Sequence, residues 1–165
     1  MPEELLIYTI GHSDHDTGEF IALLRQHSIT LVVDVRSRPY SRWAHQFNRE
    51  TLARDLEEAG IAYRFMGDVL GGRPADPTLY DPERERPDYR RVAQSPTYQA
   101  GIDRLLDLAR TERVAVMCSE GDHRRCHRHL LIAQTLLERG VRVLHIQPDG
   151  RTVKGERIAR QLSFL

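Results

Sequence analysis

The residues of this sequence that are best suited to chemistry gather in one short stretch, residues 118–128, which reads CSEGDHRRCHR. An apolar run precedes the stretch and a helical pattern follows it. The free backbone amides and positive dipole end of a helix start favour an anion. A cysteine there, Cys118, would have a lowered pKa and a larger share of thiolate. The stretch predicts an anion pocket with a candidate nucleophile; the alternative is a buried cysteine beside a solvated, charged helix start.

The spacing of Cys118 and Arg124, C-x5-R, is that of cysteine phosphatases and sulfurtransferases. In those sites, loop amides and the arginine hold an oxyanion around the thiolate. Asp34-Val35-Arg36, after a predicted strand, is likewise similar to a rhodanese-like start. Such loops favour several small residues that let the amides converge, whereas this one has a single glycine, Gly121. Phosphatase-like or rhodanese-like activity is therefore only one alternative.

A metal site is a second alternative, because thiolate and imidazole ligands together suit zinc or iron. Its ligands would be Cys118, Cys126, His127 and His12. The C-x7-C-H spacing matches no strong zinc pattern. We therefore predict no cofactor, with zinc or iron as the alternative.

Glu120 offers a third chemistry as a general acid or base at a predicted strand end. His12 or His127 would assist it in moving protons. Arg36, Arg73 and Arg128 would hold the phosphate of a ligand.

The elements that would position these residues alternate along the chain. Short apolar runs at residues 5–10, 29–35, 61–66, 113–117 and 141–146 predict five buried strands. Helical patterns separate them, with Asp16 or Thr17 as one N-cap, Asn48 as another and residues 129–139 as the last main helix. The alternation indicates an α/β fold: a single three-layer domain, residues 1–165, with a mostly parallel sheet of about five strands and helices on both faces.

Two segments depart from this alternation. Residues 67–96 are rich in proline and charge and predict a long irregular excursion, either functional or mobile, with at most a short helix near residues 89–92. The tail, residues 153–165, has an amphipathic helical pattern.

The carboxyl ends of parallel strands meet at one edge of a sheet, where ligands of open α/β sheets bind. The loops that begin there include Gly11-His12-Ser13, the stretch from Asp34 to Arg38, and Cys118-Ser119-Glu120. We therefore expect one composite pocket at that edge.

The composition of the chain bears on the class of function and on the cellular setting. Lysine plus arginine and aspartate plus glutamate number 24 each, so the chain lacks the overall basic field of a non-specific nucleic-acid binder. Its one lysine, Lys154, leaves an excess of arginine, which could suit carboxylate or phosphate recognition or reflect a GC-rich genome or heat adaptation. We expect neither a membrane-spanning segment nor a signal peptide. Two cysteines do not make a disulfide framework, so we expect a reduced, cytoplasmic setting.

Several motifs occur in an order that resembles the domain of unknown function 488 family. They are YTIGHS at residues 8–13, VDVRSRPYSR at 33–42, LGGR at 70–73, MCSE at 117–120 and CHR at 126–128, within a match from about residue 6 to 147. The family has no established function. Residues 121–125, GDHRR, depart from its pattern, so Arg124 is peculiar to this chain.

The candidate catalytic residues are Glu120, Cys118, His12 and His127. The candidate ligand-binding residues, which the resemblance supports, are Ser13, Asp34, Arg36, Ser37, Arg42, Gly71, Gly72, Arg73, Cys126 and Arg128. We expect a small enzyme, a hydrolase or transferase, whose partner is an anionic small molecule or nucleic-acid segment. The main alternative is a non-catalytic nucleic-acid or nucleotide-binding module, because residues 36–43 interleave arginines with aromatic side chains that could stack on bases.

Overall fold

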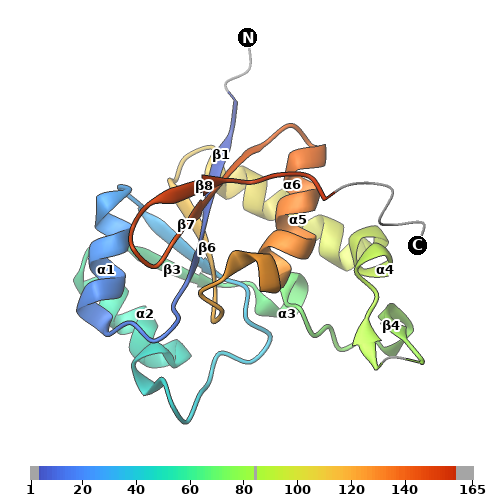
Figure 1. Ribbon diagram of the computed structural model, residues 1–165, viewed down its shortest axis with the longest axis horizontal. Helices are drawn as coiled ribbons and strands as arrows, with labels where there is room; N and C mark the ends of the chain where they lie inside the picture. Colours follow the sequence, from blue (N-terminus) through green and yellow to red (C-terminus); the bar gives the residue numbers. More distant parts are fainter. Residues whose placement is uncertain (1–3, 84, 159–165) are drawn as a thin grey trace.

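A computed structural model describes residues 4–83 and 85–158 of the chain. Within this part, six strands form a sheet in the order β3-β2-β6-β1-β7-β8 (Figure 1). The parallel strands are β1 (Leu6–Gly11), β2 (Leu31–Asp34), β3 (Ala62–Phe65), β6 (Val114–Cys118) and β7 (Arg142–Ile146). β8 (Thr152–Lys154) pairs antiparallel with β7. The predicted α/β fold with a mostly parallel sheet is confirmed.

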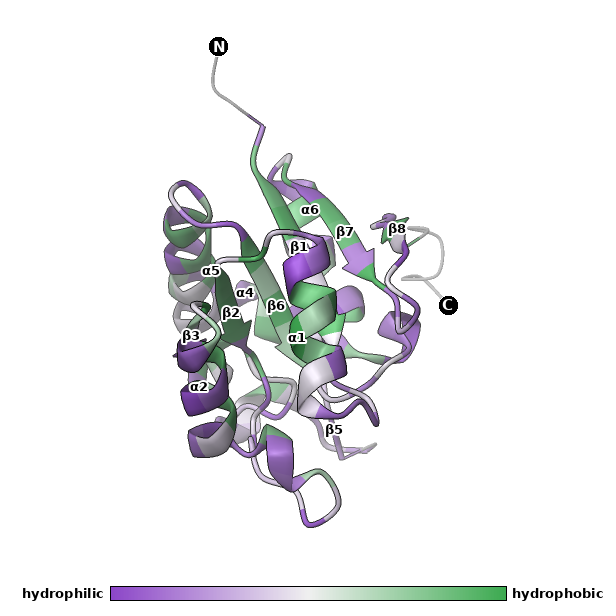
Figure 2. Cartoon of the chain, turned by 90° about the vertical axis from the view of Figure 1, so that its left-hand side faces the viewer, coloured by the Kyte–Doolittle hydropathy of each residue, from purple (hydrophilic) through white to green (hydrophobic). Residues whose placement is uncertain are grey.

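Helices cover both faces of the sheet. α1 (Thr17–Gln26) and α2 (Arg49–Glu58) pack on one face, which we call the α1 face. α5 (Pro96–Ala109) and α6 (Gln134–Glu138) pack on the other, the α5 face. In Figure 2 the strands are largely hydrophobic, while α1 and α2 also carry hydrophilic residues. Because side chains of a strand alternate, Val114 and Val116 join the α5 face while Ala115 and Met117 join the α1 face.

Local signals explain where the first helices begin. Asp16 caps α1 in a capping box with Glu19, as one of the two predicted caps. Asn48 is the N-cap residue of α2, but its side chain does not cap the helix. Its Oδ1 instead accepts a hydrogen bond of 2.7 Å from the backbone amide of Ser41, which fastens the loop before α2.

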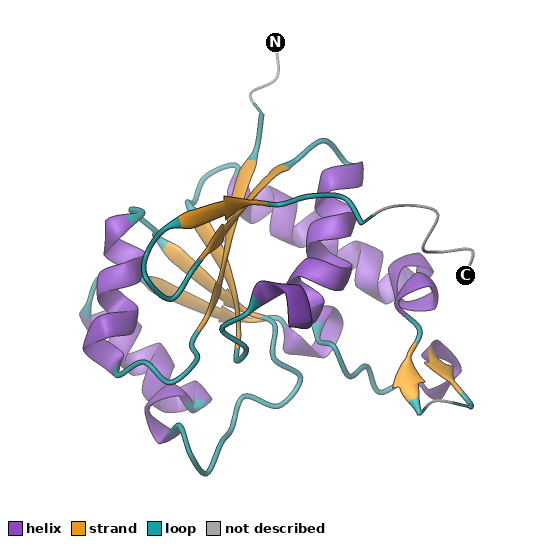
Figure 3. Cartoon of the chain, in the orientation of Figure 1, coloured by secondary structure: helices purple, strands orange, loops and turns teal. Residues whose placement is uncertain are grey.

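The excursion at residues 67–96 contains more regular structure than expected. It comprises α3 (Gly67–Leu70), a 3-10 turn η2 (Pro77–Leu79), the hairpin of β4 (Tyr80–Asp81) and β5 (Arg86–Pro87), and α4 (Tyr89–Gln94) (Figure 3). The predicted short helix near residues 89–92 is confirmed. Leu70 and Val92 anchor the excursion in the core of the α5 face.

Two predicted elements need correction. The helix expected at residues 129–139 divides into a π-helix, η4 (Arg128–Ala133), and then α6. The tail is not helical over residues 153–158, because a turn at Gly150, with a φ of 91°, returns the chain along β7 as strand β8. Residues 159–165 lie outside the described residues. None of the described helices is long and apolar enough to cross a membrane.

Candidate functional site

The predicted site residues lie on opposite faces of the sheet. Asp34 follows Val33, which belongs to the α5 face, so the carboxylate of Asp34 points to the α1 face. Cys118 follows Met117, which belongs to the α1 face, so its thiol points to the α5 face. The alternation of side chains therefore separates the expected composite pocket into two clusters.

The first cluster, which we call the sulfur cluster, consists of Cys118, Cys126 and Arg128. The Cys126 thiol donates a hydrogen bond to the sulfur of Cys118 at 2.7 Å, and the Arg128 Nε donates to that sulfur at 3.0 Å. Arg128 is fully buried, and the two cysteines are 3% and 7% exposed. Three reactive or charged groups thus meet in the interior.

Arg128 has no carboxylate among its acceptors in the described part of the chain. Its Nη1 donates to Thr9 Oγ1 at 2.6 Å, and its Nη2 donates to the carbonyl oxygens of Glu120 and Gly121 at 3.0 and 3.3 Å. A guanidinium remains protonated in proteins, and a buried charge requires a compensating partner. The sulfur of Cys118 is the group among these acceptors that can become an anion.

The pKa values of the two thiols are shifted in opposite directions. Burial alone would raise the pKa of Cys118, but the hydrogen bond from Cys126 and the charge of Arg128 outweigh burial and lower the pKa to about 7. The hydrogen bond to Cys118, together with burial, raises the pKa of Cys126. Cys118 is therefore the thiolate and Cys126 the thiol that donates to it.

His127 borders the sulfur cluster as a neutral imidazole. Its Nε2 lies 3.1 Å from both the Val35 and Leu70 carbonyl oxygens, so this nitrogen carries the proton. Its Nδ1 then faces the Cys126 sulfur at 3.7 Å as an acceptor. Burial lowers the pKa of His127 to about 4, despite these backbone hydrogen bonds.

Two motif glycines let the backbone approach this cluster. A Cβ at Gly11 would lie 1.9 Å from the Glu120 carbonyl oxygen, the same oxygen that accepts from Arg128. A Cβ at Gly72 would lie 3.0 Å from the His127 ring. The absence of a side chain at Gly72 thus leaves room for the ring of His127.

Glu120 contributes its backbone to the cluster and not its side chain. The side chain is exposed, and its Oε1 accepts a hydrogen bond from the Asp122 amide at 3.1 Å. Arg124 is also directed outward, because its guanidinium pairs with Asp122 and the side chain is 76% exposed. Cys118 and Arg124 therefore do not meet, so Arg124 is not placed as the arginine of a C-x5-R phosphatase loop.

The second cluster surrounds Asp34 on the α1 face. Asp34 is fully buried and accepts hydrogen bonds from Arg36 Nε and Nη2 at 2.9 and 2.8 Å and from the Tyr63 hydroxyl at 2.5 Å. His12 lies on the same face, stacked on Phe47 with the ring centroids 4.4 Å apart. Burial lowers the pKa of His12 to about 4, so His12 is neutral at pH 7. Arg36 is thus committed to an internal ion pair.

The remaining predicted ligand residues are less buried. The Ser37 hydroxyl accepts a hydrogen bond from the Arg73 amide at 2.8 Å, which links the motif at residues 33–42 to the motif at residues 70–73. The Ser13 amide donates to the Ser119 carbonyl at 2.9 Å. The Arg42 and Arg73 side chains are exposed.

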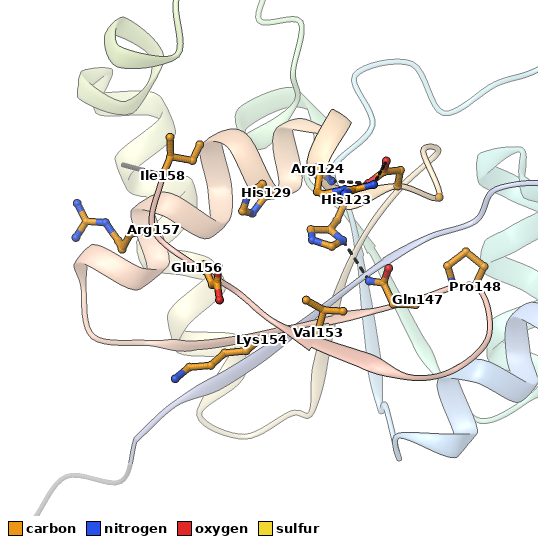
Figure 4. Close-up of a pocket in the computed structure, with 12 residues that line it drawn as sticks. His123, Arg124, His129, Gln147, Pro148, Val153, Lys154, Glu156, Arg157 and Ile158 are labelled. Atoms are coloured by element: carbon orange, nitrogen blue, oxygen red, sulfur yellow. Dashed lines mark hydrogen bonds and ion pairs between the residues drawn. The ribbon is translucent and has the colours of Figure 1, made fainter. Parts of the chain in front are cut away.

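Two cavities flank η4, the π-helix that begins at Arg128. One, of about 550 Å³, has His123 and His129 on one wall and Val153 and Lys154 of β8 on another (Figure 4). The other, of about 500 Å³, is lined in part by Gly72, Arg73, Arg86 and Tyr89. Gly72, which lines this second cavity, lies against the ring of His127, and His127 faces the Cys126 sulfur, so the cavity adjoins the sulfur cluster. Burial raises the pKa of Tyr89 on its wall.

Sequence interpretation missed a group of histidines behind the first cavity. His123 stacks on His145 with a centroid distance of 4.1 Å, and His129 packs edge-on against both rings at 5.3 Å. His145 Nδ1 also lies 2.5 Å from the Thr9 hydroxyl that Arg128 contacts. The available signal was their position in the sequence, since Thr9 lies in the first motif and His145 in the last of the five predicted strands.

A metal site is not assembled in the described part of the chain. No group of three or more histidine, cysteine or acidic side chains there has an arrangement that could hold a metal ion. Cys118 and Cys126 lie together, but His12 lies with the α1 face. The proposed zinc or iron ligand set therefore does not converge.

Comparison with known proteins gives one match. No curated protein and no solved structure matches the chain. The family described as "Domain of unknown function DUF488" matches residues 16–135, which is more than half of the chain. The chain therefore belongs to the domain of unknown function 488 family.

Proposed function

We propose that the protein is a cysteine-dependent hydrolase or transferase that acts on an anionic, phosphate-bearing substrate, with Cys118 as the nucleophile. The observation that carries this proposal is the fully buried Arg128 bonded to the sulfur of Cys118. A thiolate is the reactive form of cysteine, and a neighbouring arginine favours that form at neutral pH. A reducing compartment such as the cytoplasm would keep both thiols reduced.

Cys118 is 3% exposed, so in the proposed reaction the surrounding side chains move aside to admit the substrate. The thiolate of Cys118 then attacks the phosphorus of the substrate, so that an S–P bond forms and the bond to the departing group breaks. The thiol of Cys126, 2.7 Å from the Cys118 sulfur, protonates the departing group once the negative charge of Cys118, which raises the pKa of this thiol, has been consumed. Water or an acceptor then releases the intermediate from Cys118. Glu120, whose side chain faces solvent, is in a position to exchange protons with bulk water, not with these sulfurs.

The cavity beside Tyr89 supports the anionic nature of the substrate. Arg73, Arg86 and Arg90 line it beside Asp81 and Asp88, so the lining carries three positive and two negative side chains, and Arg73 and Arg86 are exposed to solvent. Arg128 is unsuited to this role, because Cys118, Thr9 and two carbonyl groups already occupy its nitrogens. We therefore assign substrate binding to Arg73 and assign Arg128 to the thiolate.

The test uses p-nitrophenyl phosphate as the substrate and inorganic phosphate as the competitor. We expect turnover that Cys118→Ser abolishes and that Arg73→Gln weakens through a higher KM. Arg54→Gln, which alters an exposed arginine on α2, is the matched control and should leave KM unchanged. Turnover that survives Cys118→Ser would refute the proposal, as would no turnover together with no protection of Cys118 from iodoacetamide by phosphate.

A second candidate function, binding of single-stranded nucleic acid, rests on the loop before α2. Trp43 is 93% exposed and Tyr40 is 57% exposed, and Arg38 and Arg42 beside them are exposed. Exposed aromatic side chains with neighbouring arginines suit stacking on bases and contact with phosphates. Figure 1 shows this loop extending away from the sheet.

Trp43 is the single tryptophan of the chain, so its fluorescence reports directly on this loop. We expect a single-stranded oligothymidine to quench the fluorescence at low salt and added salt to reverse the quenching. Arg42→Gln should weaken the binding, whereas Arg54→Gln should not. Unchanged fluorescence at low salt would exclude this function.

A further inference from the structure

We infer that Cys118 and Cys126 form a dithiol site that reduces a small hydroperoxide and becomes an intramolecular disulfide. This activity goes beyond the proposed function, because it requires no phosphate-bearing substrate. It rests on the sulfur-to-sulfur contact, on Arg128 and on the burial of both side chains.

The two sulfurs are already in position. The Cys126 sulfur lies 2.7 Å from that of Cys118, although the residues are eight positions apart. Cys118 ends β6, whose register is fixed by β1 and β2 on either side. The 3-10 turn η3 (His123–Arg125) fixes Cys126, whose amide donates to the His123 carbonyl and whose carbonyl accepts from the Leu130 amide. No displacement of an element is needed for the thiols to react.

The first step would be attack of the Cys118 thiolate on one oxygen of hydrogen peroxide. The S–O bond forms and the O–O bond breaks, so Cys118 becomes a sulfenic acid and hydroxide leaves, taking a proton to become water. In the second step the sulfur of Cys126 attacks the sulfur of the sulfenic acid. The S–S bond forms, the S–O bond breaks, and the thiol proton leaves with the hydroxyl as a second water. Two thiols and one peroxide thus yield one disulfide and two waters.

Arg128 makes the disulfide easy to reduce again. In the reduced state its charge is paired with the Cys118 thiolate. In the disulfide that anion no longer exists, and the acceptors that remain are the neutral Thr9 hydroxyl and two backbone carbonyls. Because a buried charge without a partner is unfavourable, the reduced state is favoured. A thiol reductant should therefore reverse the oxidation.

Because both sulfurs are buried, we expect them to react faster with small molecules than with large ones. Cys118 and Cys126 are 3% and 7% exposed, so a molecule the size of hydrogen peroxide can reach the sulfur with little change of structure. A bulky disulfide such as oxidised glutathione would have to displace the surrounding side chains. We therefore expect peroxide to oxidise the pair much faster than oxidised glutathione does.

The experiment treats the full-length reduced protein with one equivalent of hydrogen peroxide and counts thiols before and afterwards. The chain has two cysteines, so every thiol counted belongs to this site. We expect both thiols to disappear together, the monomer to lose two hydrogen atoms in mass, and dithiothreitol to restore both thiols. In Cys126→Ser the reaction should stop at a sulfenic acid that dimedone traps. In Cys118→Ser peroxide consumption should fall by about tenfold or more, because no stabilised thiolate remains.

Circular dichroism would confirm that the variants fold, and the thiol count on the wild-type protein is decisive without them. The inference is overturned if the wild-type protein retains both thiols, forms only disulfide-linked dimers, or proceeds to sulfinic acid with Cys126 still free. Hydrolysis of p-nitrophenyl phosphate is measured separately under reducing conditions. Either activity can therefore be absent while the other is present, and the two failures are told apart.

Discussion

The guanidinium of Arg128 lies 3.0 Å from the sulfur of Cys118 in the interior of the protein. The pair joins the end of β6 to the first residue of η4, across the stretch that the sequence predicted as the candidate site. It provides the thiolate on which the proposed function rests, and it makes the free energy of unfolding depend on the ionisation of a thiol.

This dependence gives a prediction for stability against pH. The pKa of Cys118 falls from 9.0 to about 7 in the folded protein, so the stability that the thiolate adds is complete above pH 9 and is lost as the pH falls through 7. The free energy of unfolding of the reduced protein should therefore rise by about 2 kcal/mol from pH 7 to pH 9. Urea unfolding at several pH values measures the rise.

Cys118→Ala provides the comparison, because it removes the titrating group and leaves Arg128 without an anion. We expect the rise above pH 7 to disappear in this variant, and its stability at pH 9 to fall by about 3 kcal/mol. A wild-type curve that is flat between pH 7 and pH 9 would mean that the pair does not carry charge.

The sequence predicted the fold well, because strands buried on both faces leave a clear apolar signal. It also selected residues 118–128 as the candidate site, and the sulfur cluster lies within that stretch. It did not predict the contact of Cys118 with Cys126, which depends on the 3-10 turn between them. Nor could it place Arg128 in the core, since an arginine is rarely buried and its partners come from β1 and β6.

The predicted composite pocket is divided because side chains alternate between the two faces of the sheet. Asp34 and Met117 are paired in register on neighbouring strands, so Cys118, one residue later, points to the other face of the sheet. Asp34 and Cys118 thus share one edge of the sheet but point to opposite faces. β8 was missed because it is only three residues long and exposed, with Val153 as its one apolar side chain.

We expect any side chain at position 11 to lower the free energy of unfolding. In Gly11→Ala the new Cβ would lie 1.9 Å from the Glu120 carbonyl oxygen, so β1 or the loop after β6 must shift and weaken the hydrogen bond from Arg128. We expect a loss of about 2 kcal/mol or more in the free energy of unfolding and a raised pKa for Cys118. Urea unfolding and the pH dependence of alkylation measure the two effects.

Gly18→Ala is the matched control. Its Cβ would meet only the Asp16 carboxylate at 3.4 Å, and alanine favours the helix, so stability should stay equal or rise by about 0.5 kcal/mol. Equal effects of the two substitutions would contradict the role given to Gly11.

Acid should unfold the protein through its buried histidines. Burial lowers the pKa values of His123, to about 4, and of His145, so both are neutral in the folded protein at pH 6. The unfolded chain takes up protons near the ordinary pKa of 6.5, so stability falls as the pH decreases from 6.5 towards 4. The slope should approach about 1.4 kcal/mol per pH unit for each histidine.

His145→Gln should reduce that slope by up to about 1.4 kcal/mol per pH unit, the contribution of one histidine. Urea unfolding between pH 6.5 and pH 4.5 measures the slope. His45→Gln, at an exposed histidine, should leave the slope unchanged. If His145→Gln had the same slope as the wild-type protein, His145 would have to be protonated in the fold.

The separation of the two clusters predicts that they respond independently to substitution. Tyr63→Phe removes the hydroxyl that donates to the buried Asp34 and leaves the carboxylate with one donor fewer. We expect the free energy of unfolding to fall by about 1–2 kcal/mol. The rate of Cys118 alkylation by iodoacetamide should stay unchanged, because Cys118 lies on the α5 face and Tyr63 acts on the α1 face.

Tyr40→Phe is the matched control, since the Tyr40 hydroxyl also donates to a carboxylate, that of Glu50, but at an exposed site. Because this pair is exposed to solvent, Tyr40→Phe should lower the free energy of unfolding less than Tyr63→Phe does. Slower alkylation of Cys118 in Tyr63→Phe, but not in Tyr40→Phe, would show that the clusters are coupled through β2 and β6. The composite pocket would then describe the site better than two faces that act independently.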